Sequence, residues 1–122
     1  MLGDLRAFDG GASDLQIGPF NHFLVYSDHA VGYRFIPRGP QQTEMHIVWL
    51  VHEEAVEGRD YQLDQLTWLW DVTTQADEKI IRYNQQGVNS VRYQPGPHAP
   101  MEWGISDFLH WYSKMLSVGL SE

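Results

Sequence analysis

Three segments in the first half of the chain have the pattern of β-strands: the first is dense in aromatic and β-branched residues, the second alternates apolar and polar residues, and the third carries apolar residues on both faces. They are residues 22–27, 31–36 and 43–52, and turn signals at Ser27-Asp28-His29-Ala30 and Pro37-Arg38-Gly39-Pro40 separate them. We therefore predict a three-stranded antiparallel meander over about residues 21–53. Residues 1–20, rich in Gly, Asp and Ser, are predicted to be an arm or loop with little regular structure.

The third segment is the strongest strand signal, and apolar residues occupy both of its faces. One face would carry Met45, Ile47, Trp49 and Val51, and the other His46, Val48, Leu50 and His52. We expect both faces to be covered in part.

From about residue 62 to residue 88 the hydrophobic period changes to that of an α-helix, at about 100° per residue. The expected stripe is Leu63, Leu66, Trp70, Thr73, Asp77, Ile80, Ile81, Asn84 and Val88. Asp60 or Asp64 could cap its start, Gly87 could mark its end, and the Thr73-Thr74 pair is a point where the helix could break.

A Pro-rich loop over residues 94–100 stops this helix, and a second helix is predicted over about residues 102–118, ended by Gly119. The order of sheet, long helix and terminal helix predicts an α+β fold. A meander of three strands leaves two open edges, which proteins normally pair or cover. We therefore expect residues 21–122 to be the C-terminal part of a larger domain.

The 122 residues carry 16 acidic and 8 basic side chains, a formal charge of −8, and no cysteine. The acidic balance disfavours nucleic acid and anionic membrane surfaces as partners. The absence of cysteine excludes disulfides, thiolate zinc sites, cysteine nucleophiles and any iron–sulfur cluster held by this chain. The longest apolar run, residues 47–51, is far shorter than a membrane span, and residues 1–11 lack the features of a signal peptide, so a cytoplasmic protein is expected.

Asp77 is the most informative candidate for chemistry, because it lies in the middle of the apolar stripe of the long helix. A buried, ionised carboxylate is costly unless it is paired, hydrogen-bonded or bound to a metal. Two structural alternatives are open. The stripe could be half exposed at this turn, or Asp77 could pair with Arg82 or Arg92.

The histidines do not have the spacing of a local metal site. His46 and His52 share a strand face but would lie about 20 Å apart, at about 3.3 Å per residue, and no pair of histidines is three to five residues apart. Five Trp and six Tyr could build an aromatic cage for a cation, although such residues more often form the core.

Spaced residues over most of the chain resemble the Rieske-type non-haem iron oxygenases. The segments that carry the resemblance are Ile17-Gly18-Pro19, Tyr26-Ser27-Asp28-His29, Tyr33-Arg34-Phe35, Trp49-Leu50-Val51, Asp60-Tyr61, Trp70-Asp71, Thr74-Gln75-Ala76-Asp77, Asn84-Gln85-Gln86-Gly87-Val88-Asn89-Ser90, Pro95-Gly96-Pro97 and Trp111-Tyr112. The chain is similar to the C-terminal end of the catalytic domain in ring-hydroxylating α subunits, most of all in the branch that acts on quaternary ammonium compounds such as glycine betaine, choline and carnitine.

This resemblance implies a helix-grip fold, in which an antiparallel sheet wraps around a long C-terminal helix. It also implies mononuclear iron(II) bound by two histidines and one aspartate, with open positions for O₂. The family's aspartate lies on the long helix, eight residues before a Gln near a Gly-containing turn, which implies Asp77 with Gln85 as the matching positions.

The sequence departs from the family where cofactors are concerned. The family's Rieske 2Fe-2S cluster is held by two cysteines and two histidines, but this chain has no cysteine. The family's iron histidines normally form an H-x-x-x-x-H pair, and no such pair occurs here. The resemblance therefore implies one of three iron ligands, an incomplete Fe(II) site and no electron entry in this chain.

For the complete enzyme, the resemblance implies O₂-dependent hydroxylation or N-demethylation of a small molecule, with a reductase or ferredoxin as electron donor and a homo-oligomer, a trimer in the family. Two alternatives stay open: a ligand-binding module of helix-grip type without redox chemistry, and an inactive remnant that only associates with a partner subunit.

Overall fold

The computed structural model describes residue 7 and residues 10–119, which divide into two compact units, Met1–Lys79 and Ile80–Glu122. The first unit contains a four-stranded antiparallel sheet and the first turns of a long helix. The second contains the end of that helix and a terminal helix. The chain is therefore α+β, as predicted.

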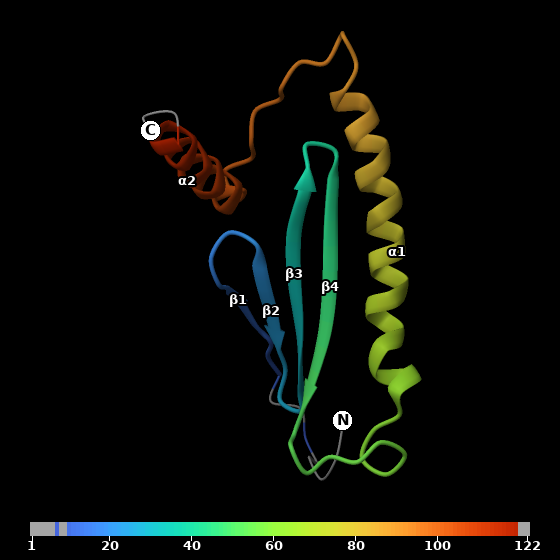
Figure 1. Ribbon diagram of the computed structural model, residues 1–122. Helices are drawn as coiled ribbons and strands as arrows, with labels where there is room; N and C mark the ends of the chain where they lie inside the picture. Colours follow the sequence, from blue (N-terminus) through green and yellow to red (C-terminus); the bar gives the residue numbers. More distant parts are fainter. Residues whose placement is uncertain (1–6, 8–9, 120–122) are drawn as a thin grey trace. The chain divides into compact units, whose positions relative to one another are not determined.

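The strands of the sheet follow one another in chain order (Figure 1). They are β1 (Ser13–Gln16), β2 (Asn21–Val25), β3 (His29–Gly39) and β4 (Gln42–Val51). Each pair of neighbours is antiparallel, and β3 and β4 form the longest pairing, from His29↔Val51 to Gly39↔Gln42. The sheet is thus a meander of four strands, where three were predicted.

The additional strand, β1, lies in the segment for which a loop was predicted. Its Ser, Asp and Gln residues surround a single apolar Leu15 and offer no alternation to detect. The strand exists because β2 supplies its partner, and the amide of Ile17 donates a 2.9 Å hydrogen bond to the carbonyl of Asn21 to close the hairpin. Gly18, with φ of 64°, gives this turn a left-handed backbone that favours glycine.

Strand β3 continues through the predicted break at Pro37. Pro37 pairs with Thr43 of β4, and the register shifts only between Pro37 and Gly39. Strand β2 pairs no further along β3 than Arg34, so the missing N–H of Pro37 falls where β3 has a single neighbour. The first predicted turn is also shorter than expected, because His29 and Ala30 belong to β3.

The two faces of the sheet differ in how well they are covered. Tyr33, on the same face as Val31, has ring contact with Trp70 of the long helix. Alternation places the following residues on this helix-facing side, all buried or half-buried: His22, Leu24, Val31, Tyr33, Phe35, Met45, Ile47, Trp49 and Val51. Val31 is fully buried.

The opposite face carries Leu15, Phe23, Val25, Val48 and Leu50 around Gly32. Val48 and Leu50 keep 47% and 52% of their surface exposed, and Leu15 keeps 47%. Both faces are therefore covered in part, as predicted, but the helix-facing side is covered more completely than the face around the buried Gly32.

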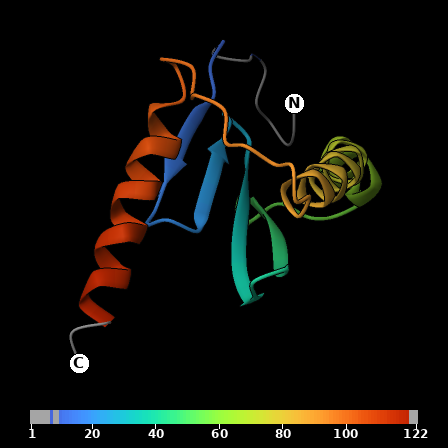
Figure 2. The same cartoon turned by 90° about the horizontal axis from the view of Figure 1, so that it is seen from above.

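The long helix, α1 (Leu63–Val88), is continuous across the predicted break. The hydroxyl of Thr73 donates to the carbonyls of Leu69 at 2.9 Å and Trp70 at 3.3 Å, so it is satisfied inside the helix. Figure 2 shows α1 end-on.

Two residues were candidates to cap the start of α1. Asp60 does not cap the helix: its carboxylate accepts a hydrogen bond from the amide of Val56 and pairs with Arg59 in the preceding turn. Asp64 lies in the first turn of the helix.

The covered side of α1 is rotated from the predicted stripe. Its buried and half-buried residues are Leu66, Thr67, Trp70, Thr74 and Gln85. Leu63, Ile80 and Ile81 were predicted to be covered but are 50%, 65% and 64% exposed. Thr74, rather than Thr73, is the threonine that faces β3.

The second unit ends in α2 (Trp103–Gly119), close to the predicted bounds. Phe108, Trp111 and Tyr112 contact one another on this helix, with ring centroids 5.9–6.5 Å apart. Of the apolar residues of α2, Phe108 is half-buried, whereas Ile105, Leu109, Tyr112, Met115 and Leu116 are 45–53% exposed. Within residues 7 and 10–119, no helix is long and apolar enough to cross a membrane.

Candidate functional site

The candidate site lies where β3 faces the middle of α1, within the first unit. Trp70, Thr74 and Asp77 follow one another at spacings of four and three residues, so they lie on one side of the helix. The Trp70 ring meets the ring of Tyr33 edge-on, with centroids 6.1 Å apart, and lies 6.2 Å from the ring of Tyr26. The aromatic rings thus connect the sheet to α1 about two turns before Asp77.

Tyr33 is the sheet residue that interacts with the most groups of this site. Burial is the main reason that its pKa is raised above the ordinary value of 10.0. Hydrogen bonding by the Thr74 side chain acts in the opposite direction, while the charges of Asp77 and Tyr26 raise the pKa further. Tyr33 therefore keeps its proton at physiological pH and lies within electrostatic reach of Asp77.

Asp77 is exposed, on the side of α1 that faces Tyr33. In the part of the chain that the structure describes, its carboxylate forms no hydrogen bond or ion pair. In particular, it pairs with neither Arg82 nor Arg92. The alternative of a half-exposed stripe is therefore the one that the structure favours. Because Asp77 is exposed, its charge does not carry the free-energy cost of a buried ion.

A second polar group beside this site involves the β2–β3 turn. The Nδ1 atom of His29 lies 2.7 Å from Oδ1 of Asp28, whose side chain is only 9% exposed. The Tyr26 ring stacks on the His29 ring at 4.8 Å and 14°. The sequence predicts only a turn here, although an acidic residue directly before a histidine is a signal for such a pair.

The remaining histidines are dispersed. His46 contacts Glu44, the His52 ring accepts the amide of Glu54 at 3.2 Å, and the His22 ring meets Phe35 at 6.1 Å. Within residues 7 and 10–119, no three His, Asp or Glu side chains form a group that could hold a metal ion. The described residues therefore do not by themselves present a complete metal site.

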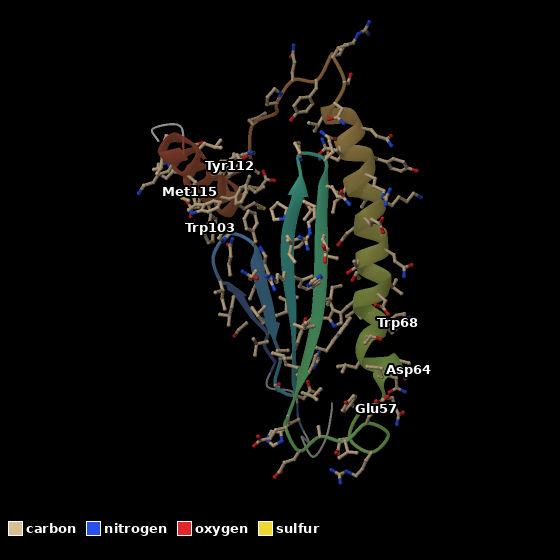
Figure 3. All side chains as sticks on the ribbon, in the orientation of Figure 1. Glu57, Asp64, Trp68, Trp103, Tyr112 and Met115 are labelled. Atoms are coloured by element: carbon tan, nitrogen blue, oxygen red, sulfur yellow. The ribbon has the colours of Figure 1, made fainter. Side chains whose placement is uncertain are left out.

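The tryptophans that could contribute to an aromatic cage differ in their surroundings. Trp70 contacts the sheet, and Trp49 is half-buried on the helix-facing side, where its Nε1 atom has no hydrogen-bond partner among the described residues. Trp68 is 63% exposed on the first turns of α1, near Asp64 (Figure 3). Trp103, Tyr112 and Met115 belong to α2 in the second unit.

Comparison with protein families identifies the class. Residues 6–118 match the family of the ring-hydroxylating α subunit, catalytic domain, and the chain belongs to this family. The family comprises oxygenase catalytic subunits that use mononuclear iron and a Rieske cluster, so the resemblance inferred from the sequence is confirmed.

The chain is similar to named relatives within that family. It is 48% identical over 95 residues to the glycine betaine monooxygenase oxygenase subunit of Chromohalobacter salexigens, covering 77% of this chain and 21% of the relative. It is 39% identical over 123 residues to the subunit of the same name in two strains of Pseudomonas aeruginosa, covering 100% of this chain and 29% of each relative. The chain thus spans less than a third of these relatives.

Proposed function

We propose that this chain forms part of the catalytic domain of a Rieske non-haem iron oxygenase and contributes Asp77 as the carboxylate ligand of the mononuclear iron. The enzyme would hydroxylate or N-demethylate a small quaternary ammonium or aromatic substrate with O₂. A reductase or ferredoxin, a cytoplasmic location and a homotrimer are the corresponding expectations for the complete protein. The domain would have a helix-grip fold, in which α1 is the gripped helix.

The observation that carries the proposal is the position of Asp77. Its carboxylate is exposed on the side of α1 that faces β3, and it has no hydrogen-bond or ion-pair partner among the described residues. Carboxylate oxygen is a suitable ligand for iron(II), and an acidic side chain already engaged by an arginine would be a poor one.

The residues of this chain fit the iron only in part. They supply one candidate carboxylate and no convergent histidines, so two imidazole ligands would have to come from outside this chain. When bound, the iron would supply the activation of O₂. The contribution of this chain is to hold Asp77 on a continuous helix that the sheet supports through Tyr33 and Trp70.

A graft tests the proposal. This chain replaces the matching segment of the Pseudomonas aeruginosa oxygenase subunit, and iron content, the Rieske spectrum and coupled O₂ uptake are measured with the native reductase. Asp77→Ala should remove iron and turnover while leaving the Rieske spectrum unchanged, because the cluster is held elsewhere. Asp71→Ala is the matched control, since Asp71 is exposed on another side of the same helix.

Substantial coupled activity in the Asp77→Ala graft would remove Asp77 from the iron site. A graft that folds and binds neither iron nor substrate would favour an inactive remnant, and one that binds substrate without iron would favour a ligand-binding module.

The 122-residue chain alone should bind Fe(II) weakly or not at all, because a facial triad needs two imidazoles besides the carboxylate. Elemental analysis after anaerobic loading measures this. Near-stoichiometric iron would mean that histidines of this chain converge on the metal.

A further inference from the structure

We propose that copies of this chain associate head to tail, with the outer face of the sheet in one copy packed against the outer side of α1 in the next. The outer face is the face of the sheet turned away from α1, and the outer side of α1 is the side turned away from the sheet. Both surfaces belong to the first unit. The inference goes beyond the proposed function, because neither surface contains Asp77 and the contact needs no iron.

The outer face of the sheet has an apolar part that the strand register defines. Two adjacent rows of cross-strand neighbours are apolar: Leu15, Phe23, Gly32 and Val48 in one, and Val25, Ala30 and Leu50 in the other. A Cβ atom on Gly32 would lie 2.7 Å from Cε1 of Phe23 and 2.9 Å from Cγ2 of Val48, so these two side chains close over the glycine. The centre of the face is therefore apolar and has no projecting side chain of its own, which leaves room for a large side chain of a partner.

The next row of the outer face carries charge. It consists of Asn21, Arg34 and His46. Glu44, on the same face, is already bound to Arg38 at 2.7 Å and to His46. Arg34 is exposed and has no hydrogen-bond or ion-pair partner among the described residues. The outer face thus presents an unpaired guanidinium beside an apolar surface, in a chain whose formal charge is −8.

The outer side of α1 offers the complementary groups. Trp68 and Val72 each lie two residues from Trp70, which contacts the sheet, so at about 100° per residue they lie on the opposite side of the helix. Trp68 is 63% exposed and Val72 49%. Asp64 lies one turn before Trp68, and its carboxylate has no ion-pair partner among the described residues (Figure 3). Tryptophan and arginine are the residues that most often anchor protein interfaces.

The spacing of the two surfaces agrees. Asp64, Trp68 and Val72 follow one another at intervals of four residues, about 6 Å each along the helix axis. Adjacent rows of the outer face are two residues apart along a strand, about 6.8 Å. When Asp64 lies over the row of Arg34, Trp68 therefore lies near Gly32, and Val72 lies near the second apolar row.

The charges favour a contact between different surfaces of the two copies. Two outer faces packed on each other would leave Arg34 without a carboxylate in both copies. Two outer sides of α1 packed on each other would bring Asp64 of each copy to a surface without a cation. The head-to-tail contact pairs the guanidinium with the carboxylate. Such a heterologous contact forms a ring when the rotation between copies closes, and an open chain when it does not.

Sedimentation of the 122-residue chain over a range of concentrations tests the inference, with circular dichroism to verify the fold of each variant. Arg34→Glu and Asp64→Lys each reverse one charge of the contact. Each should weaken association at least about tenfold, because a like-charge pair replaces an attractive one. An equimolar mixture of the two variants should associate again, since their reversed charges are complementary to each other.

Trp68→Ala should also weaken association at least about tenfold, as truncation of a central interface tryptophan does. Trp103→Ala is its matched control, at a tryptophan of α2 that is 70% exposed. Lys114→Glu is the control for charge reversal, at an exposed residue of the same helix. Both controls should associate like the parent chain.

A chain that stays monomeric at every concentration would show the inference to be wrong. So would association that both charge reversals leave unchanged, or a mixture of the two reversed variants that fails to associate. Should a charge reversal unfold the chain, Arg34→Ala and Asp64→Asn take its place, and unchanged association in both would overturn the inference. None of these measurements involves iron, so they leave the test of Asp77 unaffected.

Discussion

The two units of the chain have similar apolar content but cover it to different degrees. In the first, the sheet and the early turns of α1 face each other, and Val31 and Leu66 are 0% and 8% exposed. In the second, Ile80, Ile81 and Trp103 are 64–70% exposed, although periodicity indicates an apolar face on both helices. Hydrophobic periodicity therefore predicts that a face needs cover, but it does not predict which part of a protein supplies the cover.

Leucine truncation in each unit should give the largest contrast. Leu66→Ala removes a side chain that is 8% exposed and should lower the free energy of unfolding of the first unit by about 2 kcal/mol. Leu116→Ala makes the same change at 50% exposure on α2 and should cost less than about 0.5 kcal/mol. Native-state hydrogen exchange, which reads each unit separately, measures both. Equal effects would contradict the difference between the units.

A glycine substitution should sharpen the comparison with a smaller effect. A Cβ atom on Gly32 would lie 2.7 Å from Cε1 of Phe23 and 2.9 Å from Cγ2 of Val48, so both side chains would have to move. We expect Gly32→Ala to destabilise the sheet by about 1–2 kcal/mol, as overpacking does. Gly96→Ala meets nothing within 4 Å and should be nearly neutral. The amide protection of β2, β3 and β4 provides the measurement, and unchanged protection in Gly32→Ala would argue against close packing at this position.

The smallest expected effect is on the dependence of stability on pH. Hydrogen bonds from Arg38 first, and then from His46, lower the pKa of Glu44 below its ordinary value of 4.5. The resulting stabilisation is present above pH 4.5 and is lost as the pH falls through the lowered pKa of the folded state. Urea unfolding between pH 7 and pH 3 should therefore show a shallower loss of stability in Glu44→Gln. The control is Asp107→Asn in α2, because the carboxylate of Asp107 has no ion-pair partner among the described residues. Parallel stability curves for wild type and Glu44→Gln would contradict the expectation.

The sequence predicted the elements with strong periodicity and missed those that depend on a partner. The bounds of both helices and the existence of three strands were predictable because each has a long regular pattern. Strand β1 was not, because Ser13–Gln16 becomes a strand only by pairing with β2. The turn at Pro37 was misplaced because a proline is tolerated where a strand has one neighbour, and pairing is not visible in a single sequence.

The candidate site was predictable only in outline. Asp77 attracts attention by its place in the helical pattern and by family resemblance, but its exposure depends on how α1 is rotated against the sheet. Which threonine of α1 faces the sheet depends on the same rotation, since a rotation of one residue would have presented Thr73 instead of Thr74. The pairing of Asp28 with His29 required the geometry of the β2–β3 turn.

The order of the strands also has a consequence for how the chain folds. Every neighbour in the sheet is the next strand in sequence, so each pairing closes a short loop. Isolated hairpins form within roughly 1–10 µs, and topologies of local contacts fold faster than those that bring distant segments together. The sheet can therefore form soon after β4 is synthesised, whereas the contact of Tyr33 with Trp70 must wait for α1. During translation, the helix-facing side of the sheet would therefore stay exposed to solvent until α1 packs on it.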